Sequence, residues 1–121
     1  MITRFDAVKP YRTKDQSEIR ELMHPAVHGN KHQSLAHASV TPGQTTLLHR
    51  HFETEEIYFF LQGEGVMCLG EQRFAVAEGD TVCIPPGTPH SVENTGTVTL
   101  NILCCCCPPY RHSDTETLSG D

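Results

Sequence analysis

This chain of 121 residues lacks a basic cluster. Its nine lysines and arginines are spread along the sequence and are outnumbered by fifteen aspartates and glutamates, which gives a formal net charge of −6. A protein that binds nucleic acid or an acidic membrane surface normally presents a concentrated positive patch. We therefore expect neither nucleic acid nor a membrane as a partner.

The sequence also lacks a long apolar run. The N-terminal stretch MITRFDAVKP mixes charged, polar and apolar residues, whereas a signal peptide or a membrane-spanning helix needs a continuous apolar segment. We expect a cytoplasmic protein.

A disulfide framework is missing as well, because four of the six cysteines are consecutive, from Cys104 to Cys107. Framework cysteines are spaced along a chain. Neighbouring residues of a strand face opposite sides of a sheet, so only alternate members of this run can share a ligand. We interpret the run as small core residues, and all six cysteines as reduced thiols.

The chain does contain many turn signals, since its nine glycines and eight prolines fall at short intervals from Pro42 onward. Short apolar segments between turns indicate strands. We predict strands over residues 35–40, 46–51, 56–62, 66–69, 73–76, 81–84, 88–93 and 97–106. So many short strands must pack as a sandwich or close into a barrel, so the predicted fold class is all-β.

The segments before and after these strands have a different character. A short helix is predicted over residues 15–23, where Asp15 and Glu18 have the spacing of a capping box and an apolar stripe follows. Residues 1–14 suit an extended arm that pairs with a sheet edge, of its own chain or of a partner. We expect one domain in three parts: arm, helix and loop (1–34), barrel (35–110) and a polar, frayed tail (111–121).

The stretch GQTTLLHRHFETEEIYFFLQG, residues 43–63, contains a candidate metal site. His49 and His51 are two residues apart, so on a strand both imidazoles point to the same side. Glu56 begins the next apolar segment and can bring a carboxylate to the same point. Imidazole together with carboxylate suits a borderline divalent metal.

A second stretch, GDTVCIPPGTPHSVEN over residues 79–94, adds a third imidazole. His90 follows a proline–glycine turn, which can set the direction in which the next strand starts. Three histidines and one carboxylate make four protein ligands. A six-coordinate metal would keep two positions open, as catalysis requires.

The two stretches resemble the paired motifs of the cupin superfamily, and of small single-domain bacterial cupins in particular. The matching positions are Gly43, His49, His51, Glu56 and Gly63 in the first motif and Gly79, Pro85, Gly87, His90 and Asn94 in the second. The resemblance implies a double-stranded β-helix, or jelly-roll, barrel that is often dimeric. It also implies a metal held by His49, His51, Glu56 and His90. It does not imply one reaction, because cupins include dioxygenases, decarboxylases, isomerases, cyclases and non-catalytic binders.

Three residues are candidates for a catalytic role. Glu56 can shift between ligand and base, and Glu55 is the second choice for the ligand. Tyr58 shares the inner face with Glu56, and its hydroxyl would seek a partner if buried. His37 suits either an acid–base group or an ordinary polar position, because the sequence leaves open which face of its strand it occupies.

The functional expectation is a divalent-metal-binding cupin with one transition metal ion: iron, manganese, nickel, cobalt or zinc. We expect a metal-dependent enzyme that acts on a small oxygen-rich metabolite. A dioxygenase-type reaction is favoured over an isomerase, cyclase or decarboxylase, because only Tyr58 and His37 suggest themselves as bases. The alternative is a non-catalytic small-molecule binding or sensor protein. In either case a homodimer is expected.

Overall fold

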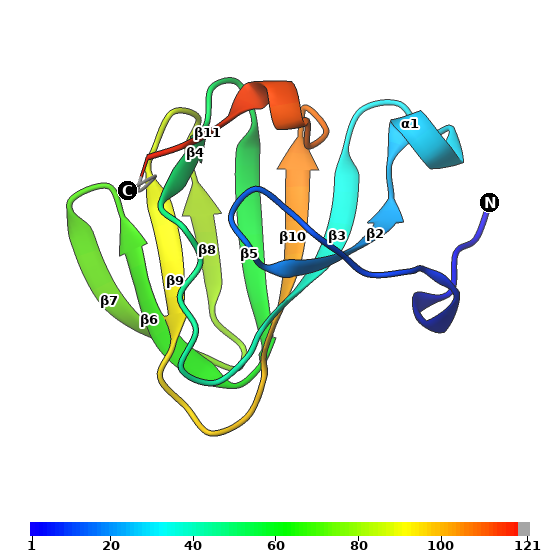
Figure 1. Ribbon diagram of the computed structural model, residues 1–121. Coiled ribbons are helices and arrows are strands. Elements are labelled where there is room, and N and C mark those ends of the chain that lie inside the picture. Colours follow the sequence, from blue (N-terminus) through cyan, green and yellow to red (C-terminus); the bar gives the residue numbers. More distant parts are fainter. Residues whose placement is uncertain (119–121) are drawn as a thin grey trace.

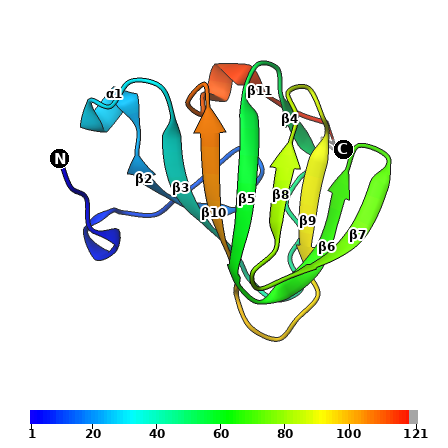
Figure 2. The ribbon, with the colours of Figure 1, turned by 180° about the vertical axis from the view of Figure 1, so that it is seen from behind.

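The computed structural model describes residues 1–118, and these residues form two antiparallel sheets that face each other (Figure 1). The strand orders are β1-β2-β3-β10-β5-β8 in the six-stranded sheet and β11-β4-β9-β6-β7 in the five-stranded sheet. Strands β2, β3, β10, β5 and β8 lie side by side when the molecule is seen from behind (Figure 2). The all-β prediction is confirmed.

The strands are short, as the turn spacing indicates. The six-stranded sheet contains β1 (Tyr11–Arg12), β2 (Glu18–Met23), β3 (Ser34–Val40), β5 (Glu55–Gln62), β8 (Thr81–Ile84) and β10 (Leu100–Cys107). The five-stranded sheet contains β4 (His49–His51), β6 (Glu64–Leu69), β7 (Gln72–Ala77), β9 (His90–Asn94) and β11 (Thr115–Thr117). Each of the eight predicted strands overlaps an observed strand.

Helical structure in residues 1–118 is confined to three short segments: η1 (Phe5–Ala7), α1 (Pro25–His28) and η2 (His112–Asp114). None of the helices in this part of the chain has the length and apolar character needed to cross a membrane.

The core lies between the sheets and follows from residue alternation. Every second residue of β10 is buried, starting at Leu100, and Ile102 of this strand lies opposite Phe60 of β5. Phe60, Leu100 and Ile102 are at most 1% exposed. Full burial of such a side chain stabilises a fold by roughly 1.5–3 kcal/mol. The same alternation carries polar side chains inward at the end of the barrel where the histidines lie.

The prediction of a helix over residues 15–23 is wrong, because most of this segment is strand β2. The Asp15 carboxylate accepts hydrogen bonds from the amide and the hydroxyl of Ser17, and Gln16 has a left-handed backbone with φ of 70°. A turn closed by such a side chain interrupts helix formation. Residues from Glu18 onward then pair with β3, where Ile19 joins the core.

The N-terminal arm pairs with a sheet edge of its own chain, since Tyr11 lies opposite Ile19 and Arg12 opposite Glu18. Between β1 and β2, the arm crosses in front of the inner face of the six-stranded sheet (Figure 1). The arm therefore forms one wall of the space in which the histidines lie.

The expected fraying of the tail is wrong up to residue 117. The Asp114 side chain is buried and accepts hydrogen bonds from the amides of Glu53 and Thr54, 3.0 and 3.1 Å away. These amides belong to the turn between β4 and β5. With that turn as an anchor, β11 pairs with β4 and places Thr115 opposite His51. Residues 119–121 of the predicted tail lie outside the described residues.

Candidate metal centre

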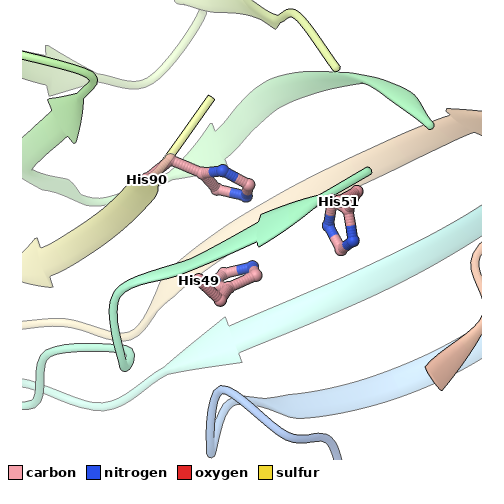
Figure 3. Close-up of side chains that lie close together, drawn as sticks. All are labelled: His49, His51 and His90. Carbon is pink, nitrogen blue, oxygen red and sulfur yellow. The ribbon is translucent and has the colours of Figure 1, made fainter. Parts of the chain in front are cut away.

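Three buried histidines meet at one end of the barrel (Figure 3). His49 and His51 belong to β4, and His90 belongs to the adjacent strand β9, where it lies opposite His49. One ring nitrogen of each lies within 4.8 Å of the others, and each residue is at most 4% exposed. The structure therefore brings the two sequence motifs together.

Backbone carbonyls orient two of these rings. The Nδ1 atom of His49 lies 2.8 Å from the carbonyl oxygen of Leu47, and Nδ1 of His90 lies 3.0 Å from that of Thr88. A carbonyl oxygen only accepts, so in each ring the hydrogen sits on Nδ1. In the neutral ring, Nε2 then carries a lone pair directed into the cluster.

The third ring is oriented by the C-terminal strand. Nδ1 of His51 lies 3.0 Å from the hydroxyl oxygen of Thr115, and this hydroxyl donates its own hydrogen to the carbonyl of Arg111 at 2.8 Å. Thr115 must therefore accept from His51, which again puts the hydrogen on Nδ1. His49 and His90 therefore present the same tautomer to the cluster, whereas Nε2 of His51 also lies within hydrogen-bond distance of Oε1 of Glu56.

The carboxylate of Glu56 lies against this cluster. Its Oε1 atom is 3.1 Å from Nε2 of His51 and 3.6 Å from Nε2 of His90. Burial by itself would raise the pKa of Glu56, but contacts with the two imidazoles outweigh it and hold the pKa well below its usual range. Oε2 accepts a hydrogen bond from the thiol of Cys106 at 3.3 Å.

The donor atoms fit a divalent metal ion. Nε2 of His90 is buried and has no hydrogen-bond partner among the described residues. Three imidazoles and a carboxylate crowd their donor atoms together in a buried site, and a divalent cation between them would stabilise this arrangement. Burial, followed by the neighbouring His90, lowers the pKa of His49, which favours the neutral form that a metal needs.

Tyr58 and His37 lie in different places. Tyr58 is buried, lines the same cavity as the cluster, and has its ring centre 6.0 Å from that of His90. Burial, followed by the charge of Glu56, raises the pKa of Tyr58, so its hydroxyl stays protonated. His37 faces the opposite side of β3, packs against Phe5, and lines a separate surface depression. His37 is not a candidate proton-transfer group at this site.

Several cavity residues were not singled out from the sequence for the site. They are Tyr11, Thr13, Asp15, Ser17, Cys106, Tyr110 and Thr115. The alternation of the cysteine run was a usable signal for Cys106, because Cys106 lies opposite Glu56 on the neighbouring strand. No local pattern indicated Asp15 or Thr115, since long-range pairing brings both to the cluster.

The cavity in front of the imidazoles is small and acidic. The cavity volume that the centres of water molecules can occupy is about 40 Å³. A single water needs roughly 10–15 Å³ of such volume. Asp15, Glu21 and Glu56 contribute carboxylates, and the lining drawn from residues 1–118 contains no lysine or arginine. A small ligand fits, and an anionic one would need a cation to bind.

The sequence matches the cupin domain family over residues 36–106. The chain belongs to the cupin family. The two facing sheets are accordingly the jelly-roll barrel of a cupin, and the fold expected from the motifs is confirmed.

Two related sequences and one crystal structure resemble this cupin over most of its length. An uncharacterized protein of Methanocaldococcus jannaschii is 55% identical over 96% of this chain and 93% of its own length. An oxalate-binding protein of Thermotoga maritima is 31% identical over 85% of this chain and 90% of its own length. The crystal structure of a predicted oxalate decarboxylase from Thermotoga maritima superposes with a TM-score of 0.78 and 29% identity, and covers 89% of this chain and 99% of the other.

Proposed function

We propose that this cupin binds one divalent transition metal ion through His49, His51, Glu56 and His90. One observation supports this most strongly: three buried imidazoles, including that of His90 with its unpartnered Nε2, cluster beside a buried carboxylate. Iron, manganese, nickel, cobalt and zinc all suit this donor set.

We further propose that the protein is a metal-dependent enzyme acting on a small oxygen-rich metabolite. A bound metal would supply Lewis acidity and, if it is redox-active, reactivity toward dioxygen. The protonated hydroxyl of Tyr58 can donate a hydrogen bond to a substrate oxygen in the cavity. The lowered pKa keeps Glu56 ionised, so its Oε1 is available as a ligand, and the thiol of Cys106 donates a hydrogen bond to its other oxygen.

A dioxygenase-type reaction remains the favoured class. A reaction driven by proton transfer needs a base near its operating pH. Of the two bases considered from the sequence, Tyr58 has a pKa raised well above its usual value and His37 lies on the other face of β3. Isomerase, cyclase and decarboxylase chemistry therefore has less support.

The alternative is a non-catalytic protein that binds a small carboxylate through its metal. The 31% identical oxalate-binding protein and the small size of the cavity favour this alternative. In both cases the metal is the anchor of the ligand.

Metal content tests the metal binding that both proposed functions require. We expect about one metal ion per chain in the wild type and a loss of most of it in the double variant His49→Ala, His51→Ala, measured by elemental analysis. The control is the double variant His28→Ala, His32→Ala, which removes two imidazoles that do not line the cavity. A wild type without stoichiometric metal, or a His49, His51 variant that keeps its metal, would refute the proposal.

Oxygen consumption separates the two functions. The metal-free protein is loaded with iron, nickel or manganese and offered a panel of diketones and enols, and separately oxalate. Oxygen uptake with any combination of metal and organic substrate supports the dioxygenase class. Calorimetric binding of oxalate without turnover supports the binding protein, and carbon dioxide release without oxygen uptake supports a decarboxylase.

A further inference from the structure

Asp15 contacts a different histidine of the cluster from the two that Glu56 contacts. Its Oδ2 atom is 3.6 Å from Nε2 of His49, and the two side chains are 12% and 5% exposed. The residue belongs to the N-terminal arm, between β1 and β2, where the arm crosses in front of the six-stranded sheet (Figure 1). A second carboxylate thus faces the imidazoles from an element outside both cupin motifs.

The arm holds this carboxylate in a defined orientation. Oδ1 accepts hydrogen bonds from the hydroxyl of Thr13 and from the amide and hydroxyl of Ser17, the last two at 3.0 and 2.6 Å. The backbone carbonyl of Asp15 also accepts from the amide of Leu47, at 2.9 Å, two residues before His49. With Oδ1 engaged in the turn, Oδ2 is the oxygen presented to the cluster.

The contact with His49 is not an ordinary hydrogen bond. Its length of 3.6 Å exceeds the range for an N–H···O bond. Since Nδ1 of His49 already donates to the carbonyl of Leu47, the neutral ring turns a lone pair toward the Asp15 carboxylate. Two electron-rich groups facing each other in a buried site are stabilised by a cation between them.

The separations suit neighbouring ligands of one ion. Around a metal with bonds of about 2.1 Å, adjacent donor atoms lie roughly 3.0–3.4 Å apart in octahedral or tetrahedral arrangements. The Glu56 oxygen lies 3.1 Å from His51 and 3.6 Å from His90. The Asp15 oxygen is 3.6 Å from Nε2 of His49, slightly above this range, and it lies outside the group of histidine donor atoms that are within 4.8 Å of one another. The Asp15 side chain would therefore move toward the cluster to share a coordination sphere with the histidines.

We propose that Asp15 is a fifth protein ligand of the metal, supplied by the N-terminal arm. The inference rests on the metal site of the proposed function and adds a residue that the cupin motifs do not contain. Two carboxylates and three neutral imidazoles balance the charge of a divalent ion. One position of a six-coordinate ion then stays open, which favours a neutral or singly charged oxygen ligand over a chelating dianion.

Metal affinity and the cobalt spectrum of Asp15→Asn test this ligand. The asparagine keeps an oxygen for the turn but replaces the charged Oδ2. We expect binding of Mn(II) and Co(II) to weaken by about tenfold or more, a size typical of altered metal contacts, in competition titrations against a chelator. The visible absorption of the Co(II) form should also change, because it reports the number and type of ligands.

A control separates ligation from charge. Asp6→Asn removes the same charge from an exposed position of the same arm. This variant should bind metal within about threefold of the wild type, with its Co(II) spectrum. If Asp15→Asn does not fold, Asp15→Ser replaces it, since serine supports this kind of turn and lacks Oδ2.

The outcomes separate the fifth-ligand proposal from the proposed metal site on which it rests. Weaker binding with an altered Co(II) spectrum in the Asp15 variant alone supports the fifth ligand. Wild-type affinity and spectrum in a folded Asp15 variant would overturn it and leave the other four ligands in place. A wild type that binds no metal would overturn the proposed function itself.

Discussion

At the scale of single residues, the site depends on contacts that its donor atoms make outside the cluster. Each imidazole donates from Nδ1 to a fixed acceptor: Leu47, Thr115 or Thr88. Such outer contacts set the tautomer and the direction of the free nitrogen. The three rings are therefore held in fixed orientations, with their Nε2 atoms on the side of the cluster.

Cys106 tests whether contacts made outside the cluster influence metal binding. Its thiol donates to Oε2 of Glu56, which leaves Oε1 directed at the imidazoles. We predict that Cys106→Ala weakens metal binding by about two- to tenfold, the equivalent of one hydrogen bond of roughly 0.5–1.5 kcal/mol. Calorimetric titration measures the change. Cys107→Ala is the matched control, because Cys107 is exposed, and equal affinities in both variants would contradict the prediction.

His37 governs a different property, the dependence of stability on pH. Burial, followed by the positive charge of Arg20, lowers the pKa of His37. The folded state then resists protonation that the unfolded chain accepts below a pH of about 6.5. We predict that the wild type loses unfolding free energy relative to His37→Gln as the pH falls through this value. Denaturant unfolding at about pH 8 and pH 5.5 measures the unfolding free energy of both proteins. The same difference between them at the two pH values would contradict the prediction.

At the scale of elements, the C-terminal segment is part of the site rather than a tail. Strand β11 pairs with β4 along its three residues and carries Thr115 to His51. Asp114 anchors this segment through the amides of Glu53 and Thr54. Residues that follow the cupin barrel in sequence thus hold one of the metal-facing histidines.

Asp114→Ala should break this anchor. The buried amide of Thr54 and the part-buried amide of Glu53 would lose their acceptor, at a cost of about 1–3 kcal/mol in unfolding free energy. Metal binding should also weaken because β11 is no longer fixed beside His51. Denaturant unfolding and metal titration test both effects. Asp80→Ala, which removes an exposed carboxylate that accepts from one amide, should cost less. An Asp114 variant as stable as the Asp80 variant would refute the role.

Local patterns predicted the strands well and the segment 15–23 poorly. In β5, alternate residues were predicted to share one inner face, and the observed burial of Glu56, Tyr58 and Phe60 follows that two-residue period. In residues 15–23, an acid three residues before another resembled a helix start, but Asp15 closes a turn instead. Pairing with β3 then decides the strand, and no local signal reports that pairing.

At the scale of the whole molecule, the outer face of the six-stranded sheet carries a group of exposed apolar side chains. Ile57, Phe59 and Leu61 of β5 are 39–40% exposed, and Leu35 of β3 is 37% exposed. Outward-facing apolar side chains on one sheet are characteristic of interaction surfaces. The homodimer expected from the cupin resemblance would cover them.

We predict a dimer, with twice the chain mass of 13.5 kDa, in light scattering after size exclusion. Phe59→Lys should shift the protein toward the monomer, because it would bury a charge in the contact. Val98→Lys is the control, since Val98 is exposed on the loop before β10 and off this face. A monomeric wild type would contradict the prediction, and an unchanged Phe59→Lys dimer would place the contact elsewhere.

The spacing of residues along the chain was sufficient to identify the barrel and the four proposed ligands. Alternation on strands and fixed turns at Gly63 and Gly87, both with positive φ, are local properties that a sequence displays directly. Asp15, Asp114 and Thr115 became part of the site only through contacts between distant segments. Their roles depend on the path of the chain, because contacts between residues 34, 61 and 64 positions apart leave no period or spacing in the sequence.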